Sequence, residues 1–233
     1  MVAPMVTAVL LAAGSGSRVG AGENKIYLKI RGKPLLSYTL ATFSESPLVD
    51  EIVLVIAGDD EHRATPLVAG LAKQVRIVHG GRRRQDSSRA GVEQARGRIV
   101  LIHDVARPFL SRELIARVLS GVEEHGACVP VLPVVDTLRY RNKNELLCSQ
   151  PVEQRGLLQM QTPQGFEREL IARALDCNDC RFTDDAGAVL ASGRPVWTVP
   201  GDAMNLKVTT KEDLSLAEAI ALVRGDDPGS RER

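Results

Sequence analysis

Short apolar runs rich in β-branched residues recur along the chain and alternate with stretches of helical periodicity. Within each run the apolar residues are nearly continuous, which is typical of strands that are buried on both faces of a parallel sheet. Between the runs, apolar residues recur at helical spacing, as at positions 114, 115, 118, 119 and 122. This alternation predicts an α/β fold with a Rossmann-like, doubly wound, mostly parallel sheet flanked by helices.

The predicted elements give about six or seven strands in one sheet. Strands are expected at residues 6–11, 52–57, 75–78, 99–102, 128–132 and 195–199, and helices at residues 35–43, 86–95, 114–124 and 214–223. Thr210 and Asp213 have the spacing of a capping box before the last helix. The length of 233 residues fits one domain, residues 1–224, followed by a mobile tail at residues 225–233 that lacks an apolar anchor.

One segment, residues 133–160, interrupts the alternation. Residues 134–140 have the composition of a strand, and residues 141–144 have that of a turn, so the segment predicts a protruding β-hairpin arm. An excursion of this size usually serves function or an oligomer contact. A plain insertion is the alternative.

The charge balance and the aromatic content exclude several classes of function. Lys and Arg number 30 against 29 Asp and Glu, so the net charge of +1 is too small to hold a nucleic acid. Phe, Trp and Tyr make up 3% of the chain, which argues against a base-stacking platform. No apolar run reaches the roughly 18 residues of a membrane helix, and the first residues lack the basic region of a signal peptide. We therefore expect a cytoplasmic protein with no nucleic-acid or membrane partner.

Four cysteines are too few for a disulfide framework, and without a secretory signal we expect them to remain reduced. Cys177 and Cys180 form a single C-x-x-C pair. A structural zinc site needs a second such pair or nearby histidines, and the four histidines all lie far upstream. We interpret the pair as incidental, with zinc or redox use as the alternative.

The first predicted strand runs into a glycine-rich loop, at the sheet edge where open α/β sheets bind ligands. The loop departs from the dinucleotide fingerprint, because Val19 stands where that pattern has its last glycine, and it lacks the G-K-S/T of a P-loop. Its glycines let backbone N–H groups approach an anion, and Arg18 and Lys25 add positive charge. This combination favours a polyphosphate that is cleaved. The alternative is a tight turn with both cations solvated.

Asp104 stands at the end of the apolar strand predicted at residues 99–102. A carboxylate at such a place is costly unless it is paired or bound to a metal. Mg²⁺ is commonly held by one or two carboxylates together with substrate phosphates. Asp104 is therefore the predicted metal ligand and a substrate-binding residue, and an ion pair with Arg107 is the alternative.

Further motifs follow the glycine-rich loop in a definite order. They are L-A-A-G-S-G-S-R-V-G from residue 11, N-K-I-Y-L-K-I from residue 24, G-K-P-L-L from residue 32, G-G at 80–81 with R-Q-D-S at 84–87, H-D-V-A-R-P from residue 103, D-T at 136–137, Q-T-P-Q-G-F from residue 161, T-D-D from residue 183, G-D at 201–202 and N-L-K-V-T from residue 205. Each is weak alone, but the ordered set is specific. Over residues 5–223 the chain resembles the 2-C-methyl-D-erythritol 4-phosphate cytidylyltransferase family.

The resemblance implies cytidylyl transfer from CTP to 2-C-methyl-D-erythritol 4-phosphate in non-mevalonate isoprenoid precursor biosynthesis. It also implies a divalent cation, normally Mg²⁺, and a homodimer in which the arm completes the neighbouring active site. A cytidylyltransferase for another polyol phosphate, such as ribitol 5-phosphate, is one alternative. A non-catalytic nucleotide-sensing protein is the other, and the retained Arg18, Lys25, Asp104 and Lys207 argue against it.

The resemblance also assigns roles to individual residues. Arg18 and Lys25 match the pair that stabilises the transition state, and Lys207 matches the lysine that positions the polyol phosphate. CTP binding falls to Ala12, Ala13, Gly14, Ser15 and Gly16 in the loop, and to Gly81, Arg84 and Ser87 on the cytosine side. Substrate binding falls to Asp104, Arg107, Thr137, Thr162 and Lys207, with Thr137 reaching the substrate from the partner's arm. As a bare sequence, residues 82–84 also fit a solvated basic face, residues 162–164 also fit a helix start, and His103 also fits a packing role.

The chain departs from the family pattern at two places. Asn24 and Ile26 flank Lys25, where the family often has proline and glutamine, which predicts a more flexible loop. The arm arginine of the family falls at Gln154, and Arg155 follows one residue later. A shift of one residue turns a side chain to the other face of an extended segment. We assign the catalytic arm role to Arg155, through a local bulge, with Lys207 holding the phosphate alone as the alternative.

Overall fold

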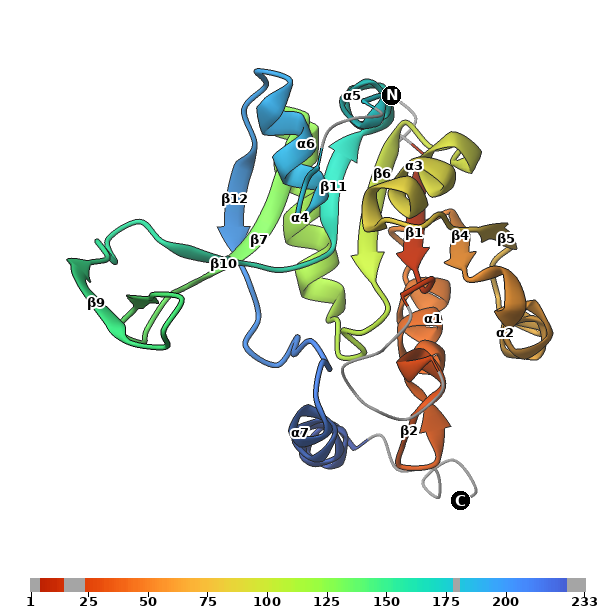
Figure 1. The fold of residues 1–233 in the computed structure, drawn as a ribbon. Coiled ribbons are helices and arrows are strands. Elements are labelled where there is room, and N and C mark those ends of the chain that lie inside the picture. Colours follow the sequence, from red (N-terminus) through yellow and green to blue (C-terminus); the bar gives the residue numbers. More distant parts are fainter. Residues whose placement is uncertain (1–4, 15–23, 178–180, 226–233) are drawn as a thin grey trace.

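The structure is a computed structural model, and it describes residues 5–14, 24–177 and 181–225. Within these residues, eight strands form the central sheet (Figure 1). The strands are β1 (Val6–Leu11), β4 (Glu51–Ile56), β5 (Val75–His79), β6 (Ile99–Asp104), β7 (Ala127–Pro133), β10 (Leu158–Met160), β11 (Gln164–Glu167) and β12 (Trp197–Pro200). Their order is β10-β7-β11-β6-β1-β4-β5, with β12 pairing in parallel to β7. Because β1, β4, β5 and β6 run parallel, the predicted fold class is confirmed.

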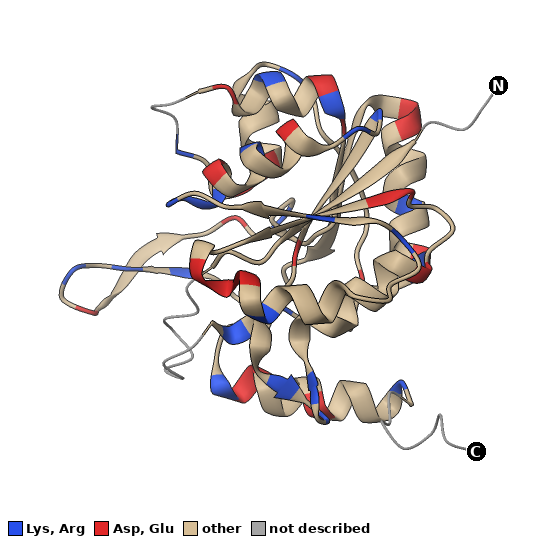
Figure 2. Cartoon of the chain, turned by 90° about the vertical axis from the view of Figure 1, so that its right-hand side faces the viewer, with Lys and Arg blue, Asp and Glu red and all other residues tan. Residues whose placement is uncertain are grey.

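Helices cover both faces of this sheet (Figure 2). All the α-helices of the described residues except α7 pack on one face or the other. The helices are α1 (Leu35–Glu45), α2 (Glu61–Val68), α3 (Arg84–Gln94), α4 (Arg112–His125), α5 (Arg168–Leu175), α6 (Asp185–Ala191) and α7 (Lys211–Val223), with short 3-10 helices η2 (Lys25–Tyr27) and η3 (Gly58–Asp60). In β1, Ala8 and Leu10 pack with α1, α2 and α4, whereas Val9 packs with α3, α5 and α6. Burial on both faces explains why the strands are continuous apolar runs in the sequence.

The remaining helix, α7, packs beside the sheet rather than on it. It joins the small hairpin of β2 (Lys29–Ile30) and β3 (Lys33–Pro34) in a separate apolar cluster that includes Ile30, Phe109 and Ala217. The predicted capping box at its start is confirmed, with Thr210 accepting from the backbone N–H of Asp213. This arrangement fixes residues 205–209 next to the end of β6, where Val208 donates its N–H to the carbonyl of Ala106.

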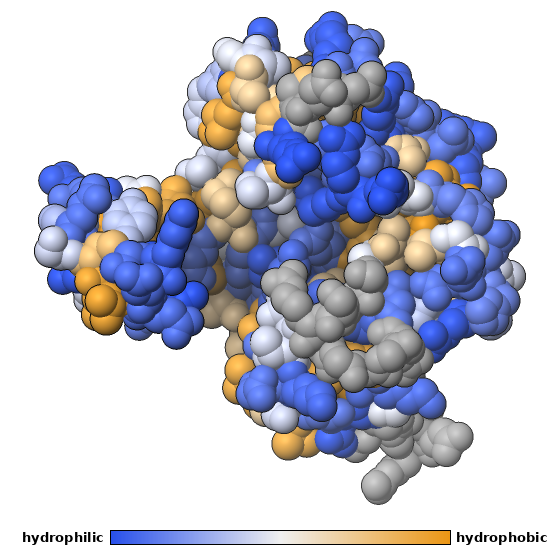
Figure 3. Space-filling view, in the orientation of Figure 1, coloured by the Kyte–Doolittle hydropathy of each residue, from blue (hydrophilic) through white to orange (hydrophobic). Residues whose placement is uncertain are grey.

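The predicted arm is a β-hairpin of β8 (Arg139–Arg141) and β9 (Leu147–Pro151) that projects from the sheet beyond β7 and β10. Its apolar side chains are exposed in this chain, with Val135 at 78% and Leu147 at 75% of full exposure. Figure 3 shows apolar residues on the arm where it stands away from the rest of the surface. An exposed apolar arm is typical of an interaction surface.

Residues 161–167 differ from the sequence-based expectation. A helix start at residues 162–164 is wrong: the cis Thr162–Pro163 bond leads into β11, which lies antiparallel between β6 and β7. This short strand is one reason why the sheet has more strands than predicted. Gly165 in β11 has to be a glycine, because a Cβ atom there would lie 2.6 Å from Val122 and 2.7 Å from Val118.

The cysteines also differ from the expectation. Cys177 is disulfide-bonded, so the prediction that all four cysteines are reduced is wrong at this position, and its partner lies outside the described residues. Cys128 and Cys148 are free. Of the predicted mobile tail at residues 225–233, residues 226–233 also lie outside the described residues.

Charged residues of both signs are interspersed over the helices and loops, and few lie in the central strands (Figure 2). This distribution agrees with the near-zero net charge and gives no extended basic face in the view shown. Within the described residues, no helix combines the length and the apolar character that crossing a membrane requires.

The α1 face of the core supplies the first prediction. Phe43 is fully buried there and packs edge-on against His103, with ring centroids 5.4 Å apart. We expect Phe43→Ala to lower the free energy of unfolding by about 3–5 kcal/mol, because the cavity left behind cannot collapse fully. Leu216→Ala, at a 55% exposed position on α7, is the control and should change it by less than about 0.5 kcal/mol. Equal effects in chemical denaturation would contradict this packing.

Candidate active site

A cavity of about 340 Å³ opens beside the carboxyl ends of β1 and β6. Its lining consists of Leu11, Ala13, Gly14, Lys25, Ile26, Gly81, Arg82, Arg83, Arg84, Ser87, Asp104, Ala106 and Lys207. The cavity therefore brings together eight of the residues predicted from the sequence: Ala13, Gly14, Lys25, Gly81, Arg84, Ser87, Asp104 and Lys207. Ligand binding at this sheet edge is what the topology of an open α/β sheet predicts.

The other predicted site residues lie elsewhere. Ala12 is buried, and Thr137 and Arg155 are exposed on the arm segment. Arg107 and Thr162 are not among the lining residues: Arg107 donates to the Asn205 carbonyl, and Thr162 accepts from the Asp104 N–H. Ser15, Gly16 and Arg18 lie outside the described residues.

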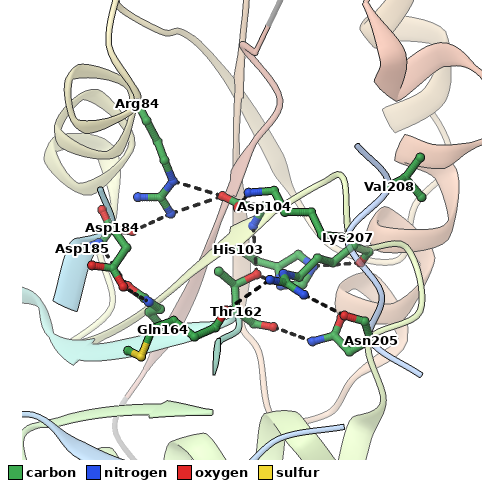
Figure 4. A network of polar contacts seen from close by, with 12 residues as sticks. Arg84, His103, Asp104, Thr162, Gln164, Asp184, Asp185, Asn205, Lys207 and Val208 are labelled. Atoms are coloured by element: carbon green, nitrogen blue, oxygen red, sulfur yellow. Dashed lines mark hydrogen bonds and ion pairs between the residues drawn. The ribbon is translucent and has the colours of Figure 1, made fainter. Parts of the chain in front are cut away.

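Asp104 is the centre of the site, held between two cations (Figure 4). The Arg84 Nε donates to its Oδ1 at 3.2 Å, and the Lys207 ammonium donates to its Oδ2 at 2.6 Å. Burial acts to raise the pKa of Asp104, but the charges of Arg84 and Lys207 outweigh it and hold the pKa well below its usual range. Asp104 is therefore ionised at neutral pH. The alternative of a side-chain pair with Arg107 is wrong, since Arg107 donates to the carbonyls of Asn205 and Met160.

Arg84 joins Asp104 to a second carboxylate, that of Asp185 (Figure 4). Its Nη2 lies 2.8 Å from Asp185 Oδ2 and 3.2 Å from Asp104 Oδ1. Burial acts to lower the pKa of Arg84, but the two carboxylates outweigh it, so the pKa is raised and the guanidinium stays charged. Sequence reasoning did not assign Asp185 to the site, although the T-D-D motif that contains it was noted. The alternative interpretation, that residues 82–84 form a solvated basic face, is therefore wrong for Arg84.

His103 is fully buried next to Asp104 and uses both ring nitrogens. The Arg107 carbonyl, 3.0 Å away, can only accept, so Nε2 carries the proton. Nδ1 then accepts from the Thr162 hydroxyl at 3.0 Å, and the Thr162 oxygen accepts from the Asp104 N–H at 3.2 Å. His103 therefore orients the backbone of Asp104 through Thr162, which is more than a packing role.

Lys25 enters the cavity from η2, and its ammonium donates to the Val208 carbonyl at 3.1 Å. Asn24 caps η2 and donates to the Ala12 carbonyl at 3.1 Å and to Asp60 at 2.8 Å. These bonds tie the segment to the end of β1, so the asparagine anchors the segment where a loose loop was expected. Lys25 is thus held next to the residue that follows Lys207.

The start of α3 forms the opposite wall of the cavity. A Cβ atom on Gly80 would lie 2.6 Å from both Ala13 and Ser87, and one on Gly81 would lie 2.4 Å from Asp86. These approaches require glycine at both positions, and they bring the Gly81 N–H within 3.2 Å of the Ser87 hydroxyl that accepts from it. Backbone groups and a hydroxyl are therefore presented at this wall.

The side chains of the site could hold a metal ion only together with oxygens from a substrate. No group of three or more His, Cys, Asp and Glu side chains that could hold a metal occurs among the described residues. Asp104 is the one carboxylate in the described lining of the cavity. Mg²⁺ keeps several waters and accepts one carboxylate when phosphate oxygens supply further ligands. The site therefore fits a Mg²⁺ ion that arrives with a polyphosphate.

Comparisons with known proteins agree with this geometry. The family model of 2-C-methyl-D-erythritol 4-phosphate cytidylyltransferase (IspD) matches residues 6–223. The chain belongs to this family. Enzymes of that name from Alkaliphilus metalliredigens and Symbiobacterium thermophilum are 37% and 40% identical to it, covering 97% and 92% of this chain and 96% and 92% of their own. The crystal structure of the Thermus thermophilus enzyme has a TM-score of 0.78 at 36% identity, over 92% of this chain and 98% of that one.

The buried imidazole gives a pH prediction for this cytidylyltransferase-family fold. Burial lowers the pKa of His103 to about 4. The unfolded chain then binds a proton at higher pH than the folded one, so stability is lost as pH falls from about 6.5 to 4. We expect His103 to account for about 3 kcal/mol of this loss.

The measurement is chemical denaturation of wild type and His103→Gln between pH 7 and pH 4. The free energy of unfolding should fall less steeply with pH in the variant. His62→Gln, at an exposed histidine, is the matched control and should follow wild type. Parallel pH profiles for wild type and His103→Gln would show that protonation of the imidazole does not lower the free energy of unfolding, which contradicts the prediction.

Proposed function

We propose that this chain transfers the cytidylyl group of CTP to 2-C-methyl-D-erythritol 4-phosphate. The products are 4-diphosphocytidyl-2-C-methyl-D-erythritol and pyrophosphate, in non-mevalonate isoprenoid precursor biosynthesis. The observation that carries the proposal is the convergence of Lys25, Arg84, Asp104 and Lys207 on one cavity in a chain of the cytidylyltransferase family.

The reaction asks for charge stabilisation more than for proton transfer. A phosphate monoester has a second pKa of about 6, so the attacking oxygen is already largely ionised at neutral pH. It attacks the α-phosphorus of CTP, a new P–O bond forms, and the bond to pyrophosphate breaks. Two anions must meet and negative charge develops on the leaving group, which fixed cations stabilise. Lys25, together with Arg18, takes this role in the proposal.

The two walls of the cavity bind different substrates in the proposal. Gly81, Arg84 and Ser87, with the loop residues 12–16, bind CTP. A hydroxyl and backbone groups distinguish cytosine from uracil because the exocyclic amine donates where uracil accepts. Lys207 positions the polyol phosphate, and Asp104, Arg107 and Thr162 border the same substrate.

Mg²⁺ completes the proposed site, with Asp104 as its protein ligand. When bound, the ion neutralises phosphate charge and polarises the α-phosphoryl group. Asp104 is suited to hold it because the carboxylate stays ionised and is the one carboxylate in the described lining of the cavity. The ion would share Oδ2 with the Lys207 ammonium.

The arm supports a homodimer in the proposal. Its exposed apolar residues are suited to burial against a second copy, and Thr137 and Arg155 would then reach the neighbouring site. Residues 1–224 form the single nucleotidyltransferase domain, and the protein acts in the cytoplasm.

Pyrophosphate release by the purified protein with CTP and Mg²⁺ tests the function. 2-C-methyl-D-erythritol 4-phosphate should support release and ribitol 5-phosphate should not, and ATP or UTP should not replace CTP. Release with ribitol 5-phosphate alone would move the chain to another polyol phosphate. No release with any pair would support a nucleotide-binding protein without this chemistry.

The same assay measures the role of Lys25. We expect Lys25→Ala to lower kcat by roughly 10²- to 10³-fold, the loss that follows removal of one preorganised transition-state contact. Lys29→Ala, at an exposed lysine of β2, should keep the wild-type kcat. Near-normal turnover in a folded Lys25→Ala variant would refute its role.

The arm predicts a split between two adjacent residues. Gln154 donates to the Val134 carbonyl at 2.7 Å and so braces the arm, whereas Arg155 is exposed. We expect Arg155→Ala to raise KM for the polyol phosphate and Gln154→Ala to leave it unchanged. No effect of either substitution would leave Lys207 as the phosphate-holding residue.

Mixed dimers test whether Arg155 acts across the interface. Inactive Lys25→Ala protein mixed with Arg155→Ala protein should gain activity at low polyol phosphate concentration, because the mixed dimer has one site with both residues intact. Activity equal to the mean of the two separate proteins would contradict action by the partner's arm.

A further inference from the structure

Asp185 is the buried charge that the reaction as proposed above leaves unused. Its side chain is 1% exposed at the first residue of α6, outside the cavity lining. Neither of its carboxylate oxygens has a hydrogen-bond partner of good geometry in the described structure. Its charge is balanced by the Arg84 guanidinium, whose Nη2 lies 2.8 Å away. Burying an ionised carboxylate is costly, so the position needs a reason.

Hydrogen bonds at the start of α6 hold the backbone of Asp185 in place. Gln164, buried in β11, accepts from the backbone N–H groups of Asp185 and Ala186 at 3.0 and 2.9 Å. Its amide donates to Asp184 at 2.8 Å, and Asp184 accepts from the Gly187 N–H to cap the helix (Figure 4). Gln164 therefore fixes the backbone of Asp185 to the sheet, and burial keeps the carboxylate against Arg84.

The fixed carboxylate decides how Arg84 meets Asp104. Arg84 directs both Nε and Nη2 to the single atom Oδ1 of Asp104, while Nη2 also serves Asp185. Guanidinium groups favour a side-by-side pair with both oxygens of a carboxylate. Asp185 draws the guanidinium aside, and Oδ2 of Asp104 is left to Lys207.

We propose that Asp185 is a positioning residue that holds Arg84 on one oxygen of Asp104, so that the other oxygen, which binds Lys207, can also bind a cation that arrives with the substrate. The inference rests on the proposed function, in which that cation is Mg²⁺ carried by CTP. Groups behind a metal ligand commonly change metal affinity or activity by 10- to 100-fold when substituted.

Asp185→Asn removes the charge and keeps the shape. Arg84 then has Asp104 as its remaining carboxylate and turns to take both oxygens. The cation side of Asp104 is blocked, while the added positive charge does not oppose CTP itself. We expect the ratio of CTP affinity with Mg²⁺ to CTP affinity with EDTA to fall by about tenfold. The Mg²⁺ concentration for half-maximal pyrophosphate release should rise by a similar factor.

Asp184→Asn is the matched control, because it disturbs the same helix start without touching Arg84. It should lower Tm and leave the affinity ratio at the wild-type value. Asp185→Ser is the second test variant, since it also removes the carboxylate and leaves Arg84 with Asp104 as its remaining carboxylate. It should shift the ratio as Asp185→Asn does, also where Asp185→Asn fails to fold.

Calorimetric titration of each protein with CTP, once with Mg²⁺ and once with EDTA, measures the ratio. A wild-type ratio in folded Asp185→Asn overturns the positioning role, and so does a wild-type ratio in Asp185→Ser where the first variant does not fold. A shifted ratio in a protein whose wild type releases no pyrophosphate would support the positioning role and refute the proposed reaction. Turnover by wild type, with wild-type ratios in the variants, would support the proposed reaction and refute the positioning role.

Discussion

The site depends on one carboxylate at the end of a buried strand. Asp104 follows the fully apolar part of β6, and its side chain is 13% exposed. A charge there is stable only with partners, and the structure supplies Arg84 from α3 and Lys207 from the segment before α7. These cations come from positions far apart in the sequence, so the pairing also brings the two walls of the cavity to one point.

The segment at residues 161–165 orients the backbone of Asp104 and of Asp185. Thr162 holds the backbone of Asp104, and Gln164 holds the start of α6, so the same few residues orient the two acidic partners of Arg84. The chain can run there only because Gly165 passes close to α4. A packing constraint on the sheet and the electrostatics of the site are thus set by residues of one short segment, residues 162–165.

The sequence predicts the parts of the fold whose signal is local. The runs that become β1, β4 and β6, and the periodic pattern of α4, carry their own burial pattern and were placed to within about one or two residues. The strand β11 has no such signal, because it is four residues long and contains Gln164 and Gly165. Its conformation is decided by its neighbours β6 and β7, which lie far away in sequence.

The same distinction holds for the site. Lys25, Asp104 and Lys207 sit in motifs that the family resemblance marks, and the cavity brings them together. Asp185 follows Asp184 directly, and an acidic pair before a helix predicts an N-cap, which Asp184 indeed provides. The second aspartate faces Arg84, which is 101 positions away, and no local pattern reveals such a contact. In the proposed homodimer the arm residues would act on a second copy of the chain, so neither the local sequence nor the fold of one chain determines their roles.

The row of charges Asp185, Arg84, Asp104 and Lys207 alternates in sign, and this order constrains how an anionic substrate can enter. A phosphate brought directly against Asp104 would meet like charge in a poorly solvated site, where repulsion is strong. A cation must therefore stand between them. Lys207 occupies that place in the structure, and because its ammonium has three N–H donors, it can donate to Asp104 and also to a phosphate oxygen. The carboxylate thus contributes by aiming a cation at the substrate, which is why its own orientation matters.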